Sequence, residues 1–157
     1  MASPEDLMRL AIDAARRGVA RGQSPFGCAI SLNGKVLTAA HNVVLLTTDS
    51  TAHAEITALR EACRSAGAVH LTGAIVATTC EPCPMCMAAL HWARVATVYY
   101  GATIADAAAG GFNELHLPAA EVLRIGKSDV KLIPGVLTEE CRALFAEWAA
   151  SPNARAY

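Results

Sequence analysis

The apolar positions near the start of the chain recur every three or four residues, which predicts a helix with one buried face. These positions are Met8, Ile12, Ala15 and Val19. Ser3 followed by Pro4 is typical of a helix start, because serine can cap the first turn and proline is tolerated at the first helical position. We expect this helix to end near Gly22.

Two short apolar segments follow, and they flank the dipeptide Asn33-Gly34. Asn-Gly favours the type I′ turn that joins two antiparallel strands. The pattern therefore predicts a β-hairpin with strands over residues 28–32 and 35–40.

A second helix is expected to begin near Thr51, because residues 47–51 are rich in side chains that cap helix starts. Residues 43–50 before it are predicted to form a loop. The helix has an apolar face and should stop at Gly67. That face consists of Ile56, Leu59, Cys63 and Ala66.

The middle of the chain has the pattern of a βαβ unit. We predict buried strands over residues 74–78 and 95–100, with a helix over residues 84–93 between them. Such a crossover makes the two strands parallel and places the loop around Cys83 at a strand carboxyl end, where open α/β sheets bind ligands.

The last third of the chain has a less regular pattern. We interpret residues 103–117 as a substrate loop, and we predict a short helix over 118–124, a final strand over 130–133 and a helix over 138–150. Residues 1–157 are expected to form one domain, because this length suits a single core and no linker interrupts it.

Composition narrows the function classes. The net charge is −1 and there are only three lysines, so no basic face for a large polyanion is expected and nucleic acid is an unfavoured partner. Apolar runs are too short to span a membrane, and no signal peptide is recognised, which favours the cytoplasm. The six cysteines show no framework spacing, so no structural disulfide is expected.

Two short segments carry the candidate chemistry. His53 and the pair Cys83 and Cys86 are suitable zinc ligands, and three protein ligands leave a fourth position open, as catalytic zinc requires. Glu55 is then free to act as the catalytic proton carrier. The alternative is a closed structural zinc, which would need a fourth Cys or His at suitable spacing.

His-x-Glu followed by Pro-Cys-x-x-Cys is the signature of the zinc-dependent base and nucleoside deaminases, and the chain resembles that family. Its likeness to bacterial guanine deaminases rests on segments spread along the chain. These are Pro25-Phe26-Gly27, His41-Asn42, Thr51–Glu55, Cys80–Cys86, Trp92-Ala93-Arg94, Asp106-Ala107-Ala108, Gly111-Phe112 and Tyr157. Residues 135–141 are similar to the last helix of the tRNA adenosine deaminases, which also share the first half.

The resemblance implies a three-layer α/β/α sandwich with a central mixed five-stranded sheet, the cytidine deaminase-like fold. It also implies a Zn²⁺ cofactor and a homodimer. In the guanine branch it further implies that the C-terminal segment, here residues 137–157, is exchanged between subunits and covers the partner's pocket.

Six residues are candidates for substrate binding beside the metal, and Glu114 is one of them. Asn42 could read a base edge through its amide or only cap the loop, and Phe26 and Trp92 could sandwich a flat ring or only fill the core. The resemblance adds Ala54 and Tyr157. Near these residues, Glu81 is expected to anchor loop amides and Cys80 to pack as a thiol.

A chemical argument favours guanine as the substrate. Guanine presents two adjacent donors, N1–H and the 2-amino group, which a carboxylate accepts well. Glu114 in the predicted substrate loop is the candidate, although the guanine branch usually has an Asp in this neighbourhood.

Hydrolysis of guanine to xanthine and ammonia is therefore the function we predict. Another small base or nucleoside, such as guanosine, cytosine or an aminotriazine, is the first alternative. Transfer-RNA adenosine deamination comes next and is disfavoured by the scarcity of lysine. The alternative outside enzymes is a zinc-stabilised binding module.

Overall fold

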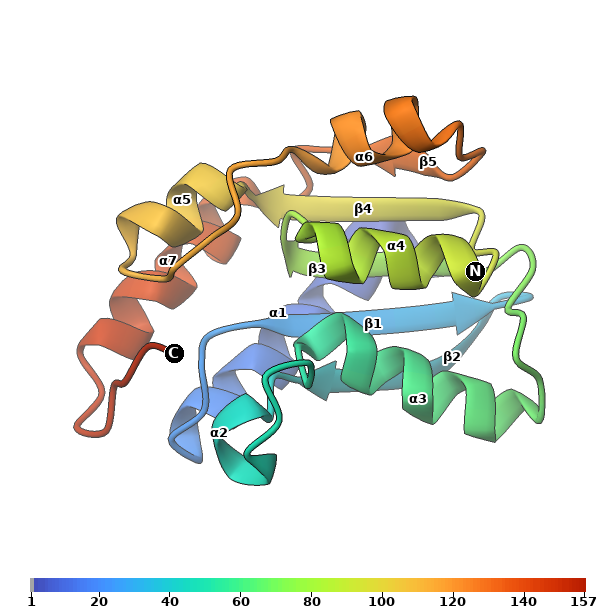
Figure 1. Ribbon diagram of the computed structural model, residues 1–157. Helices are drawn as coiled ribbons and strands as arrows, with labels where there is room; N and C mark the ends of the chain where they lie inside the picture. Colours follow the sequence, from blue (N-terminus) through green and yellow to red (C-terminus); the bar gives the residue numbers. More distant parts are fainter. Residues whose placement is uncertain (1) are drawn as a thin grey trace.

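Five strands form one mixed sheet in the computed structural model, which describes residues 2–157 (Figure 1). The strand order is β2-β1-β3-β4-β5, with bounds β1 (Gly27–Leu32), β2 (Lys35–His41), β3 (Ile75–Cys80), β4 (Thr97–Ala102) and β5 (Lys131–Ile133). β1 pairs antiparallel with β2 and β3, whereas β4 pairs parallel with β3 and β5. The predicted hairpin, βαβ unit and final strand are confirmed.

Helices cover both faces of this sheet. One face carries α1 (Pro4–Ala20) and α7 (Thr138–Ala149), and the other carries α3 (Ala54–Ala66), α4 (Pro84–Trp92) and α6 (Ala119–Gly126). Two short helices, α2 (Val44–Thr47) and α5 (Ile104–Ala109), follow β2 and β4. The three-layer α/β/α sandwich with a five-stranded mixed sheet is thus confirmed. No helix among residues 2–157 is long and apolar enough to cross a membrane.

Local sequence explains the first elements. Ser3 and Asp6 form a capping box at the start of α1, with Ser3 Oγ accepting from the Asp6 amide at 3.1 Å. Asn33 and Gly34 have φ values of 51° and 77°, the left-handed pair that a type I′ turn requires. At Gly27 a side chain would overlap the Ala11 carbonyl, so glycine permits the close approach of α1 to β1.

The segment before α3 differs from the prediction. Residues 44–47 form the short helix α2 rather than a loop, and α3 begins at Ala54 rather than near Thr51. The reason is local, because the Asp49 carboxylate accepts from both the amide and the hydroxyl of Thr51, at 2.9 and 2.7 Å. These polar side chains close a turn instead of capping a helix, and the helix start moves to His53 as its N-cap.

The sheet topology gathers one set of loops at a single edge. The amino end of β1 and the carboxyl ends of β2, β3 and β4 lie together there, because β1 runs antiparallel to its neighbours. β3 and β4 also extend two residues further toward this edge than predicted, to Cys80 and Ala102, which are paired. The loops after these strands therefore converge with the starts of α3 and α4.

Candidate active site

The three predicted ligand residues meet at this edge. His53 Nδ1 lies 3.6 Å from both Cys83 Sγ and Cys86 Sγ, and all three atoms lie within 4.8 Å of one another. In tetrahedral zinc, with Zn–N about 2.0–2.1 Å and Zn–S about 2.3 Å, nitrogen and sulfur ligands are separated by about 3.6 Å. The donor set and its spacing therefore fit zinc, with a fourth position left for a water or substrate.

Two helix starts supply these ligands. His53 is the N-cap of α3, and Cys83 is the N-cap of α4, with Cys86 in the first turn of that helix. The ion position thus lies beyond the end of α3, as the spacing of His53 and Glu55 requires. Hydrogen bonding with Cys86 and with the His53 imidazole lowers the pKa of the Cys83 thiol to about 4, which favours the thiolate that a metal needs.

Glu55 lies beside the ligands without being one of them. Its side chain is buried, with 6% exposure, and Thr78 Oγ1 donates to its Oε1 at 3.3 Å. Burial, and next the negative charge of Cys83, raise the pKa of Glu55 to about 7. A carboxylate of such basicity suits a group that takes up and returns a proton near neutral pH.

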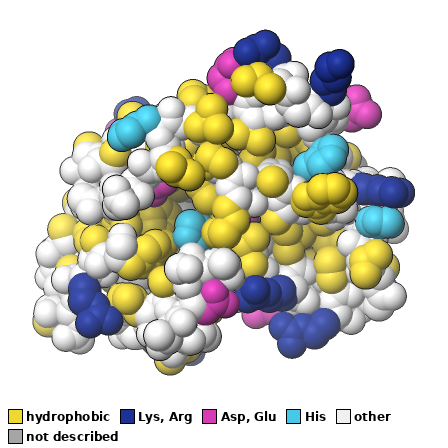
Figure 2. All heavy atoms as spheres, viewed as in Figure 1, with side chains coloured by type: hydrophobic (Ala, Val, Ile, Leu, Met, Phe, Trp, Pro, Cys, Tyr) yellow, Lys and Arg dark blue, Asp and Glu magenta, His cyan; other side chains and the backbone are white. Residues whose placement is uncertain are grey.

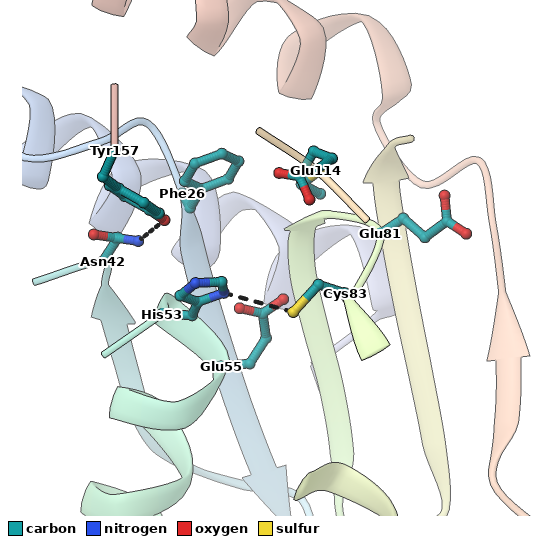
Figure 3. Close-up of a pocket in the computed structure, with 9 residues that line it drawn as sticks. Phe26, Asn42, His53, Glu55, Glu81, Cys83, Glu114 and Tyr157 are labelled. Carbon is teal, nitrogen blue, oxygen red and sulfur yellow. Dashed lines mark hydrogen bonds between the residues drawn. The ribbon is translucent and has the colours of Figure 1, made fainter. Parts of the chain in front are cut away.

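A pocket opens above these residues (Figure 3). Its lining includes most of the predicted site residues. The complete lining consists of Phe26, Asn42, His53, Glu55, Cys80, Glu81, Cys83, Glu114 and Tyr157. Residues from six separate segments of the chain therefore surround one space.

Asn42 and Tyr157 form one wall of the pocket. Asn42 is fully buried, its Oδ1 accepts from the Val44 amide at 3.0 Å, and its Nδ2 donates to the Tyr157 hydroxyl at 2.6 Å. Burial raises the pKa of Tyr157, so the phenol stays protonated. In this single chain the tail covers the chain's own pocket, and exchange of residues 137–157 between subunits stays a prediction.

An aromatic cluster supports the same wall. The ring of Phe26 lies 4.9 Å from that of Phe112 and 5.8 Å from that of Phe145, in edge-to-face arrangements. The ring centroid of Phe112 also lies 4.9 Å from that of Trp148 and 5.8 Å from that of Tyr157. Sequence reasoning missed this joint role of Phe112, Phe145 and Trp148. The only signal was the Gly111-Phe112 segment among those that carry the family resemblance.

The side chains of two predicted substrate-binding residues, Trp92 and Ala54, do not line the pocket. Trp92 is 75% exposed at the far end of α4, eight residues after Pro84, or about 12 Å at 1.5 Å per residue. The expectation that Trp92 stacks on a ring is therefore not met in this pocket. Ala54 has a fully buried side chain, so only its backbone, between His53 and Glu55, lies next to the site.

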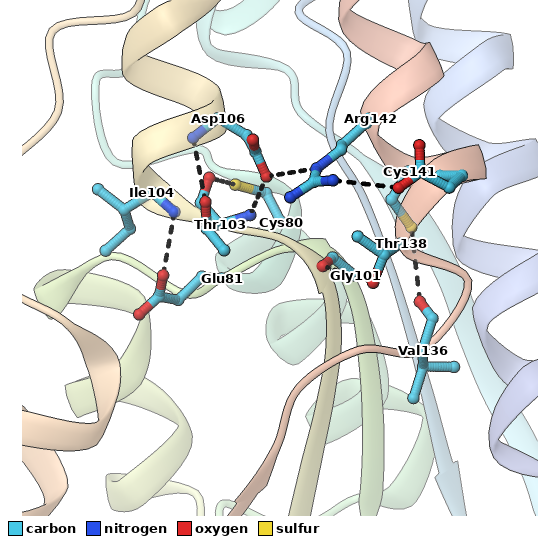
Figure 4. A network of polar contacts seen from close by, with 11 residues as sticks. Cys80, Glu81, Gly101, Thr103, Ile104, Asp106, Val136, Thr138, Cys141 and Arg142 are labelled. Atoms are coloured by element: carbon cyan, nitrogen blue, oxygen red, sulfur yellow. Dashed lines mark hydrogen bonds and ion pairs between the residues drawn. The ribbon is translucent and has the colours of Figure 1, made fainter.

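The predicted substrate loop contains a helix and is held at both ends by one side chain. Glu81 accepts from the amide of Ile104 at 3.0 Å (Figure 4) and, through its other oxygen, from the amide of Ala119, also at 3.0 Å. These amides start α5 and α6, where helix dipoles favour a negative charge. Between them, Glu114 is half-buried at the pocket, and burial followed by the charge of Cys83 raises its pKa.

The Glu81 contacts give a first testable prediction. Glu81→Gln should release one end of the 104–119 segment, because a glutamine has one acceptor oxygen where the carboxylate has two. We expect the free energy of unfolding to fall by about 1–3 kcal/mol, the usual cost of leaving a buried partner unsatisfied. We also expect KM to rise more than kcat changes. Urea unfolding and steady-state kinetics measure both effects.

The exposed Glu139, which pairs with Arg142 at 3.0 Å on α7, offers the matched control Glu139→Gln. This control should alter neither quantity measurably, because exposed ion pairs contribute little. Equal behaviour of the two variants would show that Glu81 does not hold the loop.

A mixed α/β sheet with a His-Cys-Cys metal site at its ligand-binding edge, and a buried glutamate beside the ligands, defines the zinc-binding deaminases. Sequence comparison agrees with this class. Residues 1–102 match the model of the cytidine and deoxycytidylate deaminase zinc-binding region, so the chain belongs to that family and is a deaminase of the cytidine deaminase-like fold.

Relatives in two branches of the family are similar to the chain. Guanine deaminase of Bacillus subtilis is 43% identical over 111 residues, which cover 70% of this chain and 71% of the relative. The tRNA-specific adenosine deaminase of the same organism is 33% identical over 146 residues, covering 93% and 88%. A solved structure of guanine deaminase from Nitrosomonas europaea superposes with a TM-score of 0.86 at 28% identity, covering 96% of this chain and 86% of that one.

Proposed function

We propose that the chain hydrolyses guanine to xanthine and ammonia. The observation that carries the proposal is the Glu114 carboxylate, which lies in the same pocket as Asn42, Phe26 and the metal-ligand cluster. The likeness to guanine deaminases of two organisms supports it.

Each group in the pocket has a counterpart on guanine. The Glu114 carboxylate can accept from N1–H and the 2-amino group, and the Asn42 amide, which donates to Tyr157 in the free chain, can donate to a ring acceptor. Phe26 presents an apolar ring whose orientation is fixed by Phe112 and Phe145. These contacts would orient the carbon that bears the amine toward Glu55 and the metal ligands.

His53, Cys83 and Cys86 would hold the zinc, which when bound supplies a Lewis acid that makes water easier to deprotonate. Two thiolate ligands weaken that effect, because they neutralise the charge of the ion, so a general base is needed. Glu55 would take the first proton of the attacking water and pass it to the ring nitrogen, and would then take the proton of the added hydroxyl and deliver it to the departing amine. The balance is one guanine and one water consumed, and one xanthine and one ammonia formed.

Ammonia release from guanine, guanosine, cytosine, adenosine and tRNA tests the proposal. We expect release from guanine at a kcat/KM well above that of the other four. Preferential release from any other substrate would contradict the guanine assignment while leaving the deaminase class intact. Absence of release from all five would favour the zinc-stabilised binding module.

The second candidate is tRNA adenosine deamination, which the similarity over 93% of the chain supports. Charge weighs against it, because the net charge is −1 and phosphate-binding surfaces need clustered basic side chains. On the face shown in Figure 2, Lys and Arg side chains lie scattered around the rim rather than gathered in one patch.

Glu114→Gln should lower kcat/KM for guanine by about tenfold to a hundredfold, because a hydrogen-bonding carboxylate becomes an amide with one acceptor oxygen. Zinc content should not change, since Glu114 is outside the ligand cluster. Glu114→Asp is the matched control, and it should retain more activity because it keeps the carboxylate. Equal kinetics for wild type and Glu114→Gln would remove Glu114 from substrate recognition.

A further inference from the structure

One polar side chain in the core contacts the proposed proton carrier. Thr78 lies in β3, is 2% exposed, and donates from Oγ1 to Glu55 Oε1 at 3.3 Å. Its register partner on β1 is Cys28, whose side chain is fully buried. Burial raises the pKa of the Cys28 thiol, which therefore remains neutral.

The contact distinguishes the two oxygens of Glu55. The bond from Thr78 ties Oε1 of the carboxyl group to β3. At 3.3 Å the bond is longer than the usual O–H···O distance of about 2.7–2.8 Å, and catalytic hydrogen bonds commonly tighten when substrate binds.

We propose that Thr78 is a positioning residue for the deamination, which holds the Glu55 carboxyl group in one orientation through Oε1 during the proton transfers. This role rests on the proposed function of Glu55. Thr78 is not part of the pocket lining, and its hydroxyl bonds to Glu55 rather than to a metal-ligand residue. Its absence should therefore affect turnover more than substrate binding.

The neighbouring Thr79 provides a matched control. It is equally buried, at 2% exposure, but adjacent strand residues point to opposite faces, and its Oγ1 accepts from the Gly27 amide at 3.1 Å. Loss of the Thr79 hydroxyl leaves a buried amide without its partner and should lower stability. It removes no contact with Glu55.

The test compares Thr78→Val, Thr78→Ser and Thr79→Val in the zinc-loaded full chain. Valine keeps the shape of threonine without the hydroxyl, so Thr78→Val should lower kcat by about tenfold to a hundredfold, the worth of a hydrogen bond to a charged group. KM should change less than about twofold, and the zinc stoichiometry should equal that of wild type. Thr78→Ser should restore most of kcat, and Thr79→Val should lower the unfolding midpoint in urea with kcat nearly unchanged.

Three results would overturn the proposal. They are wild-type kcat in Thr78→Val, failure of serine to rescue, and an equal loss of kcat in Thr79→Val. A Glu55→Gln variant measured in parallel separates the positioning role of Thr78 from the proton-carrier role of Glu55. If Glu55→Gln retains turnover, the proton-carrier role of Glu55 fails and the role of Thr78 fails with it. If Glu55→Gln is inactive and Thr78→Val is not, only the role of Thr78 fails.

A readout independent of turnover comes from a double-mutant cycle on unfolding. Alanine removes both carboxylate oxygens, so if Thr78 and Glu55 share the hydrogen bond, the destabilisation by Thr78→Val and by Glu55→Ala should not add in the double variant. Additive effects would show that the two side chains are not coupled and would contradict the proposal.

Discussion

Glu55→Gln is expected to reduce ammonia release by about a thousandfold, within the range that general acid–base catalysis contributes. Glutamine has nearly the same size but cannot take a proton from water and return it to the leaving amine. Bulk water cannot take over the proton transfers of Glu55 efficiently, since this side chain is only 6% exposed. Single-turnover and steady-state assays of ammonia release measure the effect.

Zinc content separates loss of the proton carrier from loss of the metal. Glu55 is not among the three ligand residues, so the glutamine variant should bind zinc at the wild-type stoichiometry, as measured by elemental analysis of the purified protein. Retained turnover in a zinc-loaded Glu55→Gln variant would exclude the proton-carrier role.

Cys83→Ala should abolish both zinc binding and turnover. The remaining ligands, His53 and Cys86, cannot fill a catalytic site that needs three protein ligands. A thermal midpoint below that of wild type is also expected, because a metal that binds only the folded chain stabilises it. Elemental analysis, thermal unfolding and ammonia release follow the three effects.

Cys63→Ala is the control for this experiment. Cys63 is a partly buried thiol on α3 and lies outside the ligand cluster. The control should keep zinc and turnover, whereas treatment of wild type with a chelator should reproduce the Cys83→Ala phenotype. Normal zinc content in Cys83→Ala would assign the metal to other residues.

Local sequence was sufficient to predict the elements that depend on neighbours in the chain. The Asn33-Gly34 turn and the Ser3 cap are set by residues within a few positions of one another, and each element of the βαβ unit is set by its own apolar run; all three features are present. The metal ligands were also predictable, because Cys83 and Cys86 chelate from one helix start and His53 completes a strict spacing.

Features that depend on long-range packing were not predictable in the same way. The aromatic support of Phe26 joins residues from three distant segments, and no local pattern indicates that Phe112 and Trp148 meet. Trp92 illustrates the opposite case, since an aromatic residue close in sequence to the metal ligands ends on the surface. Its place on α4, rather than its chemistry, decides its exposure.

The bridge made by Glu81 has a thermodynamic consequence. Its backbone belongs to the segment that leads to Cys83, while its carboxylate fixes the starts of α5 and α6 on either side of Glu114. Ordering one segment therefore lowers the entropic cost of ordering the other. Reciprocity of linked equilibria then requires that any gain in base affinity caused by zinc be matched by an equal gain in zinc affinity caused by the base. If such coupling exists, the affinity for zinc measured with and without the base would differ by the same factor as the affinity for the base measured with and without zinc.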